Sequence, residues 1–281
     1  MTRAIDVHVH PPTPEYLEGS GGPYFANAFG VRERAEPLSD LVRSFRAQGV
    51  EHAVLLAWDA QVRSGRPPTA NAFVADAVRR FDPFFIGFGS VDPWKGQEAL
   101  AELARFRSEY GFRGVKFHPP AQGFSPADPR FFPMWDLIVE QDLVVLAHAG
   151  HTGYGAGLPG GRGVRLTHAR PFPDFEVLTT AFPRLRLICA HPGWPWHDDL
   201  LALAMHKSNV WIDLSGWSPK YLPPSVVQHA RTLLKDKVLF GTDYPVITPS
   251  RWIGDLRDLG FSDAVLDKVL YRNAARLLGI E

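Results

Sequence analysis

The chain has 281 residues, and its 30 Lys and Arg residues balance its 30 Asp and Glu residues. A zero net charge argues against nucleic acid or an anionic membrane surface as the main partner, because both favour a basic excess. The hydrophobic content of 45% is typical of a globular protein and excludes a largely disordered chain. No apolar stretch reaches the roughly 18 residues of a membrane span. The single cysteine excludes an intrachain disulfide, and the first strand-like segment begins too early for a signal peptide, so we expect a cytoplasmic protein.

Short apolar runs alternate with amphipathic segments along the whole chain. The predicted strands are Ala4–His10, Val50–Ala57, Phe84–Val91, Phe112–His118, Leu143–Gly150, Leu185–His191, Val210–Ser215 and Val238–Tyr244. The predicted helices are Pro37–Gln48, Thr69–Phe81, Glu98–Tyr110, Phe131–Gln141, Asp174–Ala181, Asp198–His206, Ser225–Leu234 and Ser262–Leu278. Eight strand–helix units of about 35 residues predict a single (β/α)8 TIM barrel domain over residues 1–281. An open doubly wound sheet is the alternative, but the glycine-rich phosphate turn that it needs after the first strand is absent.

Two histidines end the first predicted strand. Side chains alternate along a strand, so His8 and His10 share one face. Two imidazoles one pleat repeat apart can bind a single metal ion. A pair of hydrogen-bonded core histidines is the alternative when this motif is taken alone.

Further polar residues end the fifth, sixth and eighth strands, where the active site of such a barrel forms. These residues are His148, His191 and Asp243, and each follows an apolar run. Four histidines and one aspartate therefore converge on one end of the barrel. Such a set suits Zn²⁺ or another divalent transition metal with an open position for water. Buried titratable groups are costly to leave unpaired, which weakens the alternative that these residues are ordinary core residues without a metal.

The fourth strand ends with Lys116 and His118 on one face. Lys116 could hold a substrate carboxylate, with His118 at the rim of the site. It could instead pair with an acid such as Asp213, and a carbamylated lysine that bridges two metals is a weaker third reading. Cys189, on the same face as His191, is interpreted as a buried inert thiol because no separate base accompanies it.

A glycine-rich loop follows the fifth strand, with seven glycines between Gly150 and Gly163. Such a loop can approach a ligand closely or move as a lid. We predict that His151 and Tyr154 face the ligand. Arg162 suits a carboxylate or phosphate, although a solvated arginine is an equal reading. Trp194 and Trp217, in later loops, could form a flat pocket for an aromatic substrate or could simply pack the loops.

The set His8-x-His10, His148, His191 and Asp243 resembles the amidohydrolase superfamily, and more closely its amidohydrolase-2 group of decarboxylases and lactonases. The stretches Gly114–Pro119, Phe240–Pro245 and Tyr271–Gly279 match the same group. The resemblance implies one divalent ion, Zn²⁺ most commonly or Mn²⁺, bound by His8, His10, His148 and Asp243. It also implies that His191 lies beside the attacking water or the substrate carbonyl.

The stretches His148–Leu166 and Ile212–Tyr221 are similar to those of 4-hydroxyphenyl-β-ketoacyl-CoA hydrolases, which cleave a carbon–carbon bond next to a ketone. We therefore expect a metal-dependent hydrolase of aromatic catabolism, with Asp243 as general base and His191 polarising the carbonyl. A non-oxidative decarboxylase on the same site is the first alternative, and a catalytically dead barrel used for binding is the second. The expected partner is a small molecule, and family analogy suggests a homodimer.

Overall fold

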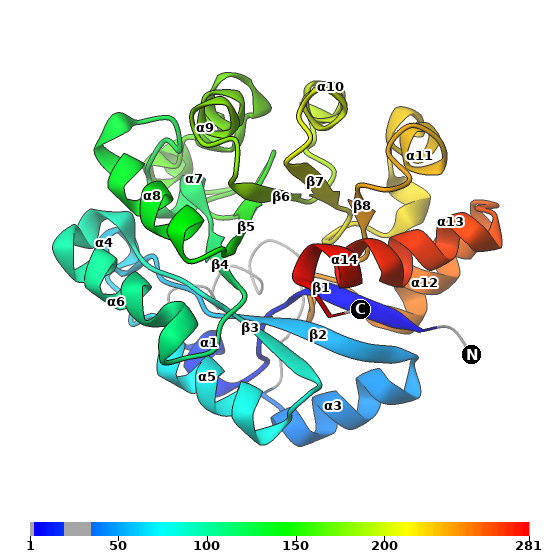
Figure 1. The fold of residues 1–281 in the computed structure, drawn as a ribbon, viewed down its shortest axis with the longest axis horizontal. Helices are drawn as coiled ribbons and strands as arrows, with labels where there is room; N and C mark the ends of the chain where they lie inside the picture. Colours follow the sequence, from blue (N-terminus) through cyan, green and yellow to red (C-terminus); the bar gives the residue numbers. More distant parts are fainter. Residues whose placement is uncertain (1–2, 20–34, 281) are drawn as a thin grey trace.

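The computed structural model describes residues 3–19 and 35–280. Within these ranges eight parallel strands form one sheet, in the order β1 to β8. The strands are β1 (Ala4–Val9), β2 (Val50–Leu56), β3 (Phe85–Gly89), β4 (Gly114–Phe117), β5 (Val144–His148), β6 (Arg186–Ala190), β7 (Val210–Asp213) and β8 (Val238–Leu239). Figure 1 shows the strands at the centre of the molecule with the helices around them. The predicted (β/α)8 barrel is confirmed.

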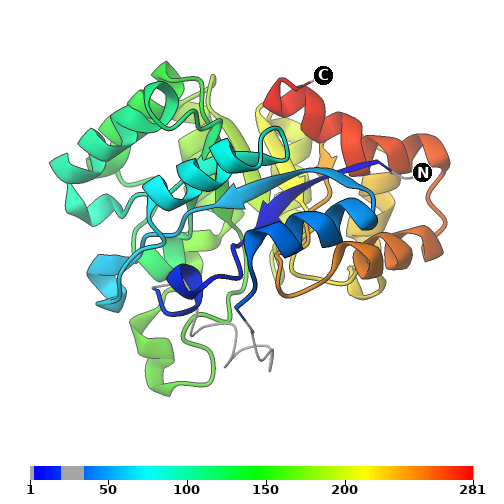
Figure 2. The same cartoon turned by 90° about the horizontal axis from the view of Figure 1, so that it is seen from below.

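The ring of strands closes between β1 and the segment that follows β8. The two residues of β8 pair with β7. On the other side, the Val7 amide donates to the Phe240 carbonyl oxygen at 3.0 Å and the His10 amide donates to the Tyr244 carbonyl oxygen at 3.0 Å. Figures 1 and 2 both place β1, in dark blue, beside the red C-terminal helices. The predicted strand Val238–Tyr244 is therefore too long, because β8 ends at Leu239 and Tyr244 pairs with Val9 as an isolated bridge.

Helices cover the outside of the barrel. The longer ones are α3 (Leu38–Ala47), α5 (Asn71–Arg80), α6 (Gln97–Ser108), α8 (Phe132–Glu140), α9 (Glu176–Ala181), α10 (His197–His206), α11 (Pro224–Arg231), α12 (Pro249–Asp258), α13 (Asp263–Asp267) and α14 (Asn273–Leu278). Short helices α1 (Pro14–Leu17), α4 (Gln61–Ser64) and α7 (Pro119–Gln122) lie in loops. Seven further single turns are η1 (Pro93–Lys95), η2 (Pro129–Phe131), η3 (Pro159–Gly163), η4 (Leu166–Ala169), η5 (Pro171–Phe175), η6 (Pro219–Tyr221) and η7 (Lys268–Arg272).

The helices differ from the sequence prediction in two places. Helix α12 was not predicted, although Pro249 at its first turn and the buried Trp252, Ile253 and Leu256 are the usual signals of an amphipathic helix. The predicted helix 262–278 is interrupted by the π-helical turn η7, which separates α13 from α14. No helix in the described residues is long and apolar enough to cross a membrane.

Apolar side chains form two main buried layers. Alternate strand residues such as Leu56, Leu146 and Ile188 form one cluster with α14. The intervening residues, such as Val145 and Leu187, pack against the surrounding helices in the other cluster. Because side chains alternate along a strand, His148 points to the same side of β5 as Leu146, toward the barrel interior. This histidine is one of the predicted site residues, so the barrel interior continues directly into the polar centre.

Candidate functional site

His8, His10 and Asp243 meet at the end of the barrel, as predicted. The Nε2 atoms of His8 and His10 lie 3.2 Å and 3.3 Å from Asp243 Oδ1. All three side chains are buried. His8 lies on β1, His10 directly follows that strand, and Asp243 comes from the turn after β8. The seam that closes the barrel therefore brings these three side chains together.

His8 is oriented by the end of β7. Its Nδ1 donates to Asp213 Oδ2 at 2.7 Å, and Ser215 Oγ lies 2.9 Å from the same nitrogen. Asp213 also accepts hydrogen bonds from the amide and hydroxyl of Ser215. With the proton on Nδ1, His8 presents the lone pair of Nε2 to Asp243. A carboxylate behind a ligating histidine is the usual arrangement in metal sites.

This donor set fits a divalent cation. The Nε2 lone pair of His8 and the Oδ1 atom of Asp243 face each other with no proton between them, an arrangement that a nearby positive charge stabilises. Ligand atoms about 2.0–2.1 Å from a tetrahedral ion lie about 3.3 Å apart. The two distances to Asp243 Oδ1 match that spacing, and the ligand atoms of all three residues lie within 4.8 Å of one another.

Ionisation of these groups agrees with that reading. Burial lowers the pKa of His8 well below its usual value, and the Lys116 ammonium adds to the effect. Burial likewise lowers the pKa of His10. Burial alone would raise the pKa of Asp243, but the charge that His8 carries when protonated and the hydrogen bond with His10 outweigh it, so that pKa lies below its usual value and Asp243 is the group that ionises first. The site therefore presents neutral histidines and a carboxylate, which are the forms that bind metal.

Lys116 lies inside this centre. Its Nζ donates to His8 Nε2 at 3.0 Å, and the side chain is 1% exposed. Burial lowers the pKa of Lys116 to about 8, against the opposing effect of the Asp243 and Asp213 carboxylates. Asp213 contacts His8, and no ion pair joins it to Lys116 among the described residues, so the alternative pairing of Lys116 with Asp213 is not a direct contact in this structure. The ammonium is the cation nearest to the ligand atoms.

His148 lies next to the group of three rather than within it. Its Nε2 donates to the His151 carbonyl oxygen at 3.1 Å, and its ring stacks on His118 at 4.0 Å between centroids. The Nδ1 atom of His118 accepts from the Ala121 amide, and its Nε2 donates to Thr152 Oγ1 at 3.1 Å. The chain thus satisfies both ring nitrogens of His118. The ligand role of His148 and the substrate contact of His118 stay predictions.

His191 presents a proton acceptor to the site. Its Nδ1 donates to the Ser215 carbonyl oxygen at 3.0 Å, which leaves Nε2 with the lone pair. Burial lowers the pKa of His191, so the ring is neutral. His191 and Asp243 also have left-handed backbone angles, with φ of 72° and 57°. Such a conformation costs a non-glycine residue about 1–3 kcal/mol, and strained residues of this kind cluster at functional sites.

An open pocket of about 490 Å³ adjoins this centre. His148, His191 and Asp243 line both the open pocket and a small inner cavity that contains His8, His10 and Lys116. The remaining wall of the open pocket is largely aromatic and aliphatic. It includes His151, Gly153, Ala156, Gly216, Trp217, Ser218, Tyr221, Val246, Ile247 and Arg251. A ligand in this pocket would therefore lie directly against the candidate metal site.

The structure places some of the predicted substrate-binding residues at the open pocket and others away from it. His151 and Trp217 line the open pocket. Trp194 packs between them, 5.5 Å from the His151 ring and 6.5 Å from the Trp217 ring. Tyr154 packs instead against a buried cluster that includes Trp58 and Ala121, and its ring lies 6.4 Å from that of His118. Arg162 is exposed in η3, where its carbonyl oxygen accepts from Arg63. The structure thus places neither Tyr154 nor Arg162 on the wall of the open pocket.

Sequence reasoning missed four residues of the site. Asp6 accepts hydrogen bonds from the Thr242 amide and hydroxyl and so joins β1 to the loop of Asp243. Strand alternation could have revealed it, because it shares the face of His8. Ser215 and Gly216 follow Asp213, and Gly216 leaves room for the rings beside it. Arg251 lies on the helix that was not predicted.

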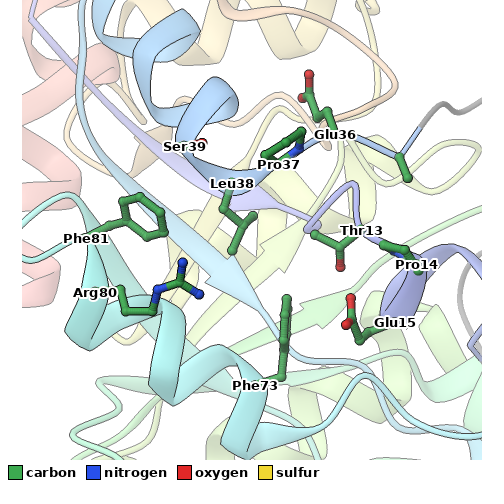
Figure 3. Close-up of a pocket in the computed structure, with 11 residues that line it drawn as sticks. Thr13, Pro14, Glu15, Glu36, Pro37, Leu38, Ser39, Phe73, Arg80 and Phe81 are labelled. Carbon is green, nitrogen blue, oxygen red and sulfur yellow. The ribbon is translucent and has the colours of Figure 1, made fainter.

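Other hollows lie away from this centre. Figure 3 shows one of about 430 Å³, lined by Phe73 and Arg80 of α5, by Leu38 of α3 and by residues near α1. It contains none of the predicted site residues. The open pocket is the one that contacts His191 and Asp243, and we therefore treat it as the candidate substrate site.

Comparisons with known proteins agree with the barrel fold. The sequence profile described as "Amidohydrolase" matches residues 5–280. An uncharacterised TIM-barrel protein from Bordetella bronchiseptica is 22% identical, with a TM-score of 0.83 and coverage of 99% of this chain and 98% of the other.

Two further solved structures are also similar in fold. A dihydroxybenzoic acid decarboxylase from Polaromonas, solved with manganese and 2-nitroresorcinol, is 20% identical, with a TM-score of 0.71 and coverage of 100% and 98%. A probable 2-pyrone-4,6-dicarboxylic acid hydrolase from Acinetobacter baumannii, solved with citric acid, is 16% identical, with a TM-score of 0.63 and coverage of 99% and 100%. At these identities the likeness shows a shared fold.

Proposed function

The chain belongs to the amidohydrolase family, and we propose that within it the chain is a metal-dependent hydrolase that adds water to a carbonyl carbon of a small aromatic, β-keto or lactone substrate. One observation carries this proposal: His191 and Asp243 both present proton-accepting atoms to the open pocket, beside the candidate cation site. Hydrolysis begins when water loses a proton, so a base at this position is the first requirement of the reaction.

The ion would be held by His8, His10 and Asp243, with His148 as the further predicted ligand. A bound Zn²⁺ or Mn²⁺ would supply acidified water and positive charge beside the substrate oxygen. The buried, neutral imidazoles and the ionised carboxylate are already in the protonation states that such an ion needs. Asp213 keeps the His8 ring in the ligating tautomer.

The chain's own groups then move the proton. His191 accepts a proton from water through Nε2, directly or by relay through Asp243, while the water oxygen bonds to the carbonyl carbon. Protonated His191 donates from Nε2 to the carbonyl oxygen, a contact worth about 3–4 kcal/mol in a good oxyanion site. Collapse breaks the bond to an enolate or alkoxide leaving group, which takes the proton. The carbonyl of Ser215 keeps the ring oriented throughout.

A non-oxidative decarboxylase is the second candidate. The buried ammonium of Lys116 offers a positive partner for a substrate carboxylate at the same centre. The similarity in fold to a dihydroxybenzoic acid decarboxylase also favours this candidate. In that reaction the carbon–carbon bond to the carboxylate breaks, carbon dioxide leaves, and a proton replaces it on the ring carbon. In either reaction we propose a small-molecule ligand, and a homodimer stays a proposal.

Metal analysis combined with an activity panel tests these functions. The panel contains lactones, β-keto acids and hydroxyaryl acids, and it is run with detection of both new acid groups and carbon dioxide. Hydrolysis that depends on a stoichiometric divalent ion supports the first proposal. Carbon dioxide from hydroxyaryl acids without acyl cleavage identifies the second candidate. A protein with neither bound metal nor turnover refutes both and revives the binding-only barrel.

Substitution of the base provides a matched control. Asp243→Asn should abolish turnover, because the amide is a poor ligand and no base. Asn tolerates the left-handed backbone at this position. Asp142→Asn, at φ 53° in the loop before β5, makes the same chemical change at a similar backbone angle outside the site. It should leave turnover unchanged. Near wild-type activity of Asp243→Asn would remove Asp243 from the mechanism.

A further inference from the structure

The open pocket has opposite charges on different parts of its wall. Its anion is Asp243, which is buried beside the histidines at the inner end. Its cation is Arg251, in the first turn of α12, and no other Lys or Arg is among the described residues that line it. Between them the wall includes the rings of Trp217 and Tyr221 and the aliphatic side chains of Val246 and Ile247.

Arg251 is poorly neutralised by the protein. Its one ion pair among the described residues joins Nε to Asp255 Oδ2 at 4.0 Å, the outer limit of such contacts. The same carboxylate oxygen accepts a much closer hydrogen bond, at 2.5 Å, from Ser218 Oγ. The two terminal nitrogens of the guanidinium have no hydrogen-bond partner among the described residues, although they form the fork that matches a carboxylate.

The exposure of Arg251 makes it suitable for ligand binding. Its side chain is 57% exposed, so a ligand anion can reach it without a large loss of solvation. Lys116 is the other cation near the site, but it is buried in the inner cavity and already contacts His8. The two cations therefore serve different positions, one beside the reacting atoms and one at the pocket mouth.

We propose that Arg251 binds an acidic group on the substrate that is remote from the reacting carbon, so that the pocket selects ring compounds with a carboxylate on the far side. The proposal rests on the proposed function only in taking the open pocket as the substrate site, and it holds for either reaction. The reacting end lies against His191 and Asp243, the ring lies against Trp217, and the second acid reaches Arg251.

Equilibrium binding tests this assignment without turnover. The probes are benzoate, isophthalate, terephthalate and 4-carboxyphenylacetate, titrated into the metal-loaded protein by calorimetry. We expect at least one diacid to bind about tenfold more tightly than benzoate, the gain expected from a charge-assisted hydrogen bond at a partly exposed position. Arg251→Met should lose that preference, and Arg251→Lys should keep part of it. Arg79→Met, on α5 and outside the pocket, removes the same charge and should keep all of it.

The outcomes separate this inference from the proposed function. A diacid preference that disappears only in Arg251→Met supports the inference even if the activity panel finds no hydrolysis. Equal affinity for diacids and benzoate in the wild-type protein, or an unchanged preference in Arg251→Met, overturns it even if hydrolysis is found. Where a substrate is known, Arg251→Met should raise KM for the acid substrate and leave kcat close to the wild-type value.

Discussion

Gly216 should be intolerant of any side chain, because the proposed catalytic groups His191 and Asp243 fill the space beside it. A Cβ at this position would lie 2.8 Å from His191 Nδ1 and 3.2 Å from Asp243 Oδ2. Its φ of 73° also favours glycine. In Gly216→Ala the left-handed backbone costs about 1 kcal/mol, and the contact adds about 1–3 kcal/mol, as other overpacked sites do. Unfolding in urea should therefore show a loss of about 2–4 kcal/mol.

Turnover should fall further than stability alone explains. Relief of the contact requires His191 or Asp243 to move by several tenths of an ångström, and a displacement of about 1 Å at a catalytic group costs about 100-fold in rate. Gly111→Ala is the control, because Gly111 has a φ of 68° and no atom within 4 Å of its Cβ position. It should lose about 1 kcal/mol of stability and no activity. Equal activity of the two alanine variants would refute the placement of Gly216 against the catalytic pair.

Three further predictions concern the buried charges. Asp213→Asn presents an amide donor to His8 Nδ1 and so favours the tautomer with the proton on Nε2, which cannot bind metal through that atom. Metal affinity should fall about 10- to 100-fold while the fold is retained. An unchanged affinity, measured against a competing chelator, would contradict this. Burial raises the pKa of Asp6 from 3.8 to about 7. Between these values the native state binds a proton that the unfolded state has released, so the free energy of unfolding falls as pH rises from about 4 to 7. In chelator, Asp6→Asn should gain about 4 kcal/mol relative to wild type between pH 4 and 8, whereas a difference independent of pH would count against a raised pKa. Removal of the ion by a chelator should abolish turnover, and Zn²⁺ or Mn²⁺ should restore it; turnover that survives complete chelation would exclude a metal-dependent reaction.

Patterns within single strands predicted the fold and the centre of the site well. The alternation of apolar and polar residues placed His8 and His10 on one face, and the ends of the later strands supplied Asp243. These inferences need only the period of a strand and the rule that barrel strands end at one face. The structure confirms the barrel and brings these three residues together.

Contacts between distant segments were beyond such reasoning. The tautomer of His191 depends on a backbone carbonyl at Ser215, and a carbonyl leaves no mark in the sequence. Lys116 could be interpreted from the sequence as the partner of a substrate carboxylate or of an acid such as Asp213, but its hydrogen bond is to His8. Arg251 reaches the pocket from α12, whose apolar spacing was readable, yet its packing beside the site depends on the whole barrel. The sequence pattern therefore predicts which face of a strand or helix a side chain lies on better than it predicts which residue that side chain contacts.

Because the barrel closes after β8, an ion at the candidate site would also stabilise the barrel against local opening. Two amide hydrogen bonds, from Val7 and His10, join β1 to the residues after β8, and the ligand set crosses the same seam. An ion bound there would link the first strand of the barrel to the last, so its binding free energy would oppose opening of this seam. The amide protons of Val7 and His10 should then exchange with solvent more slowly in the loaded protein than in the metal-free protein. Loss of the ion and local opening of the barrel would be one coupled equilibrium.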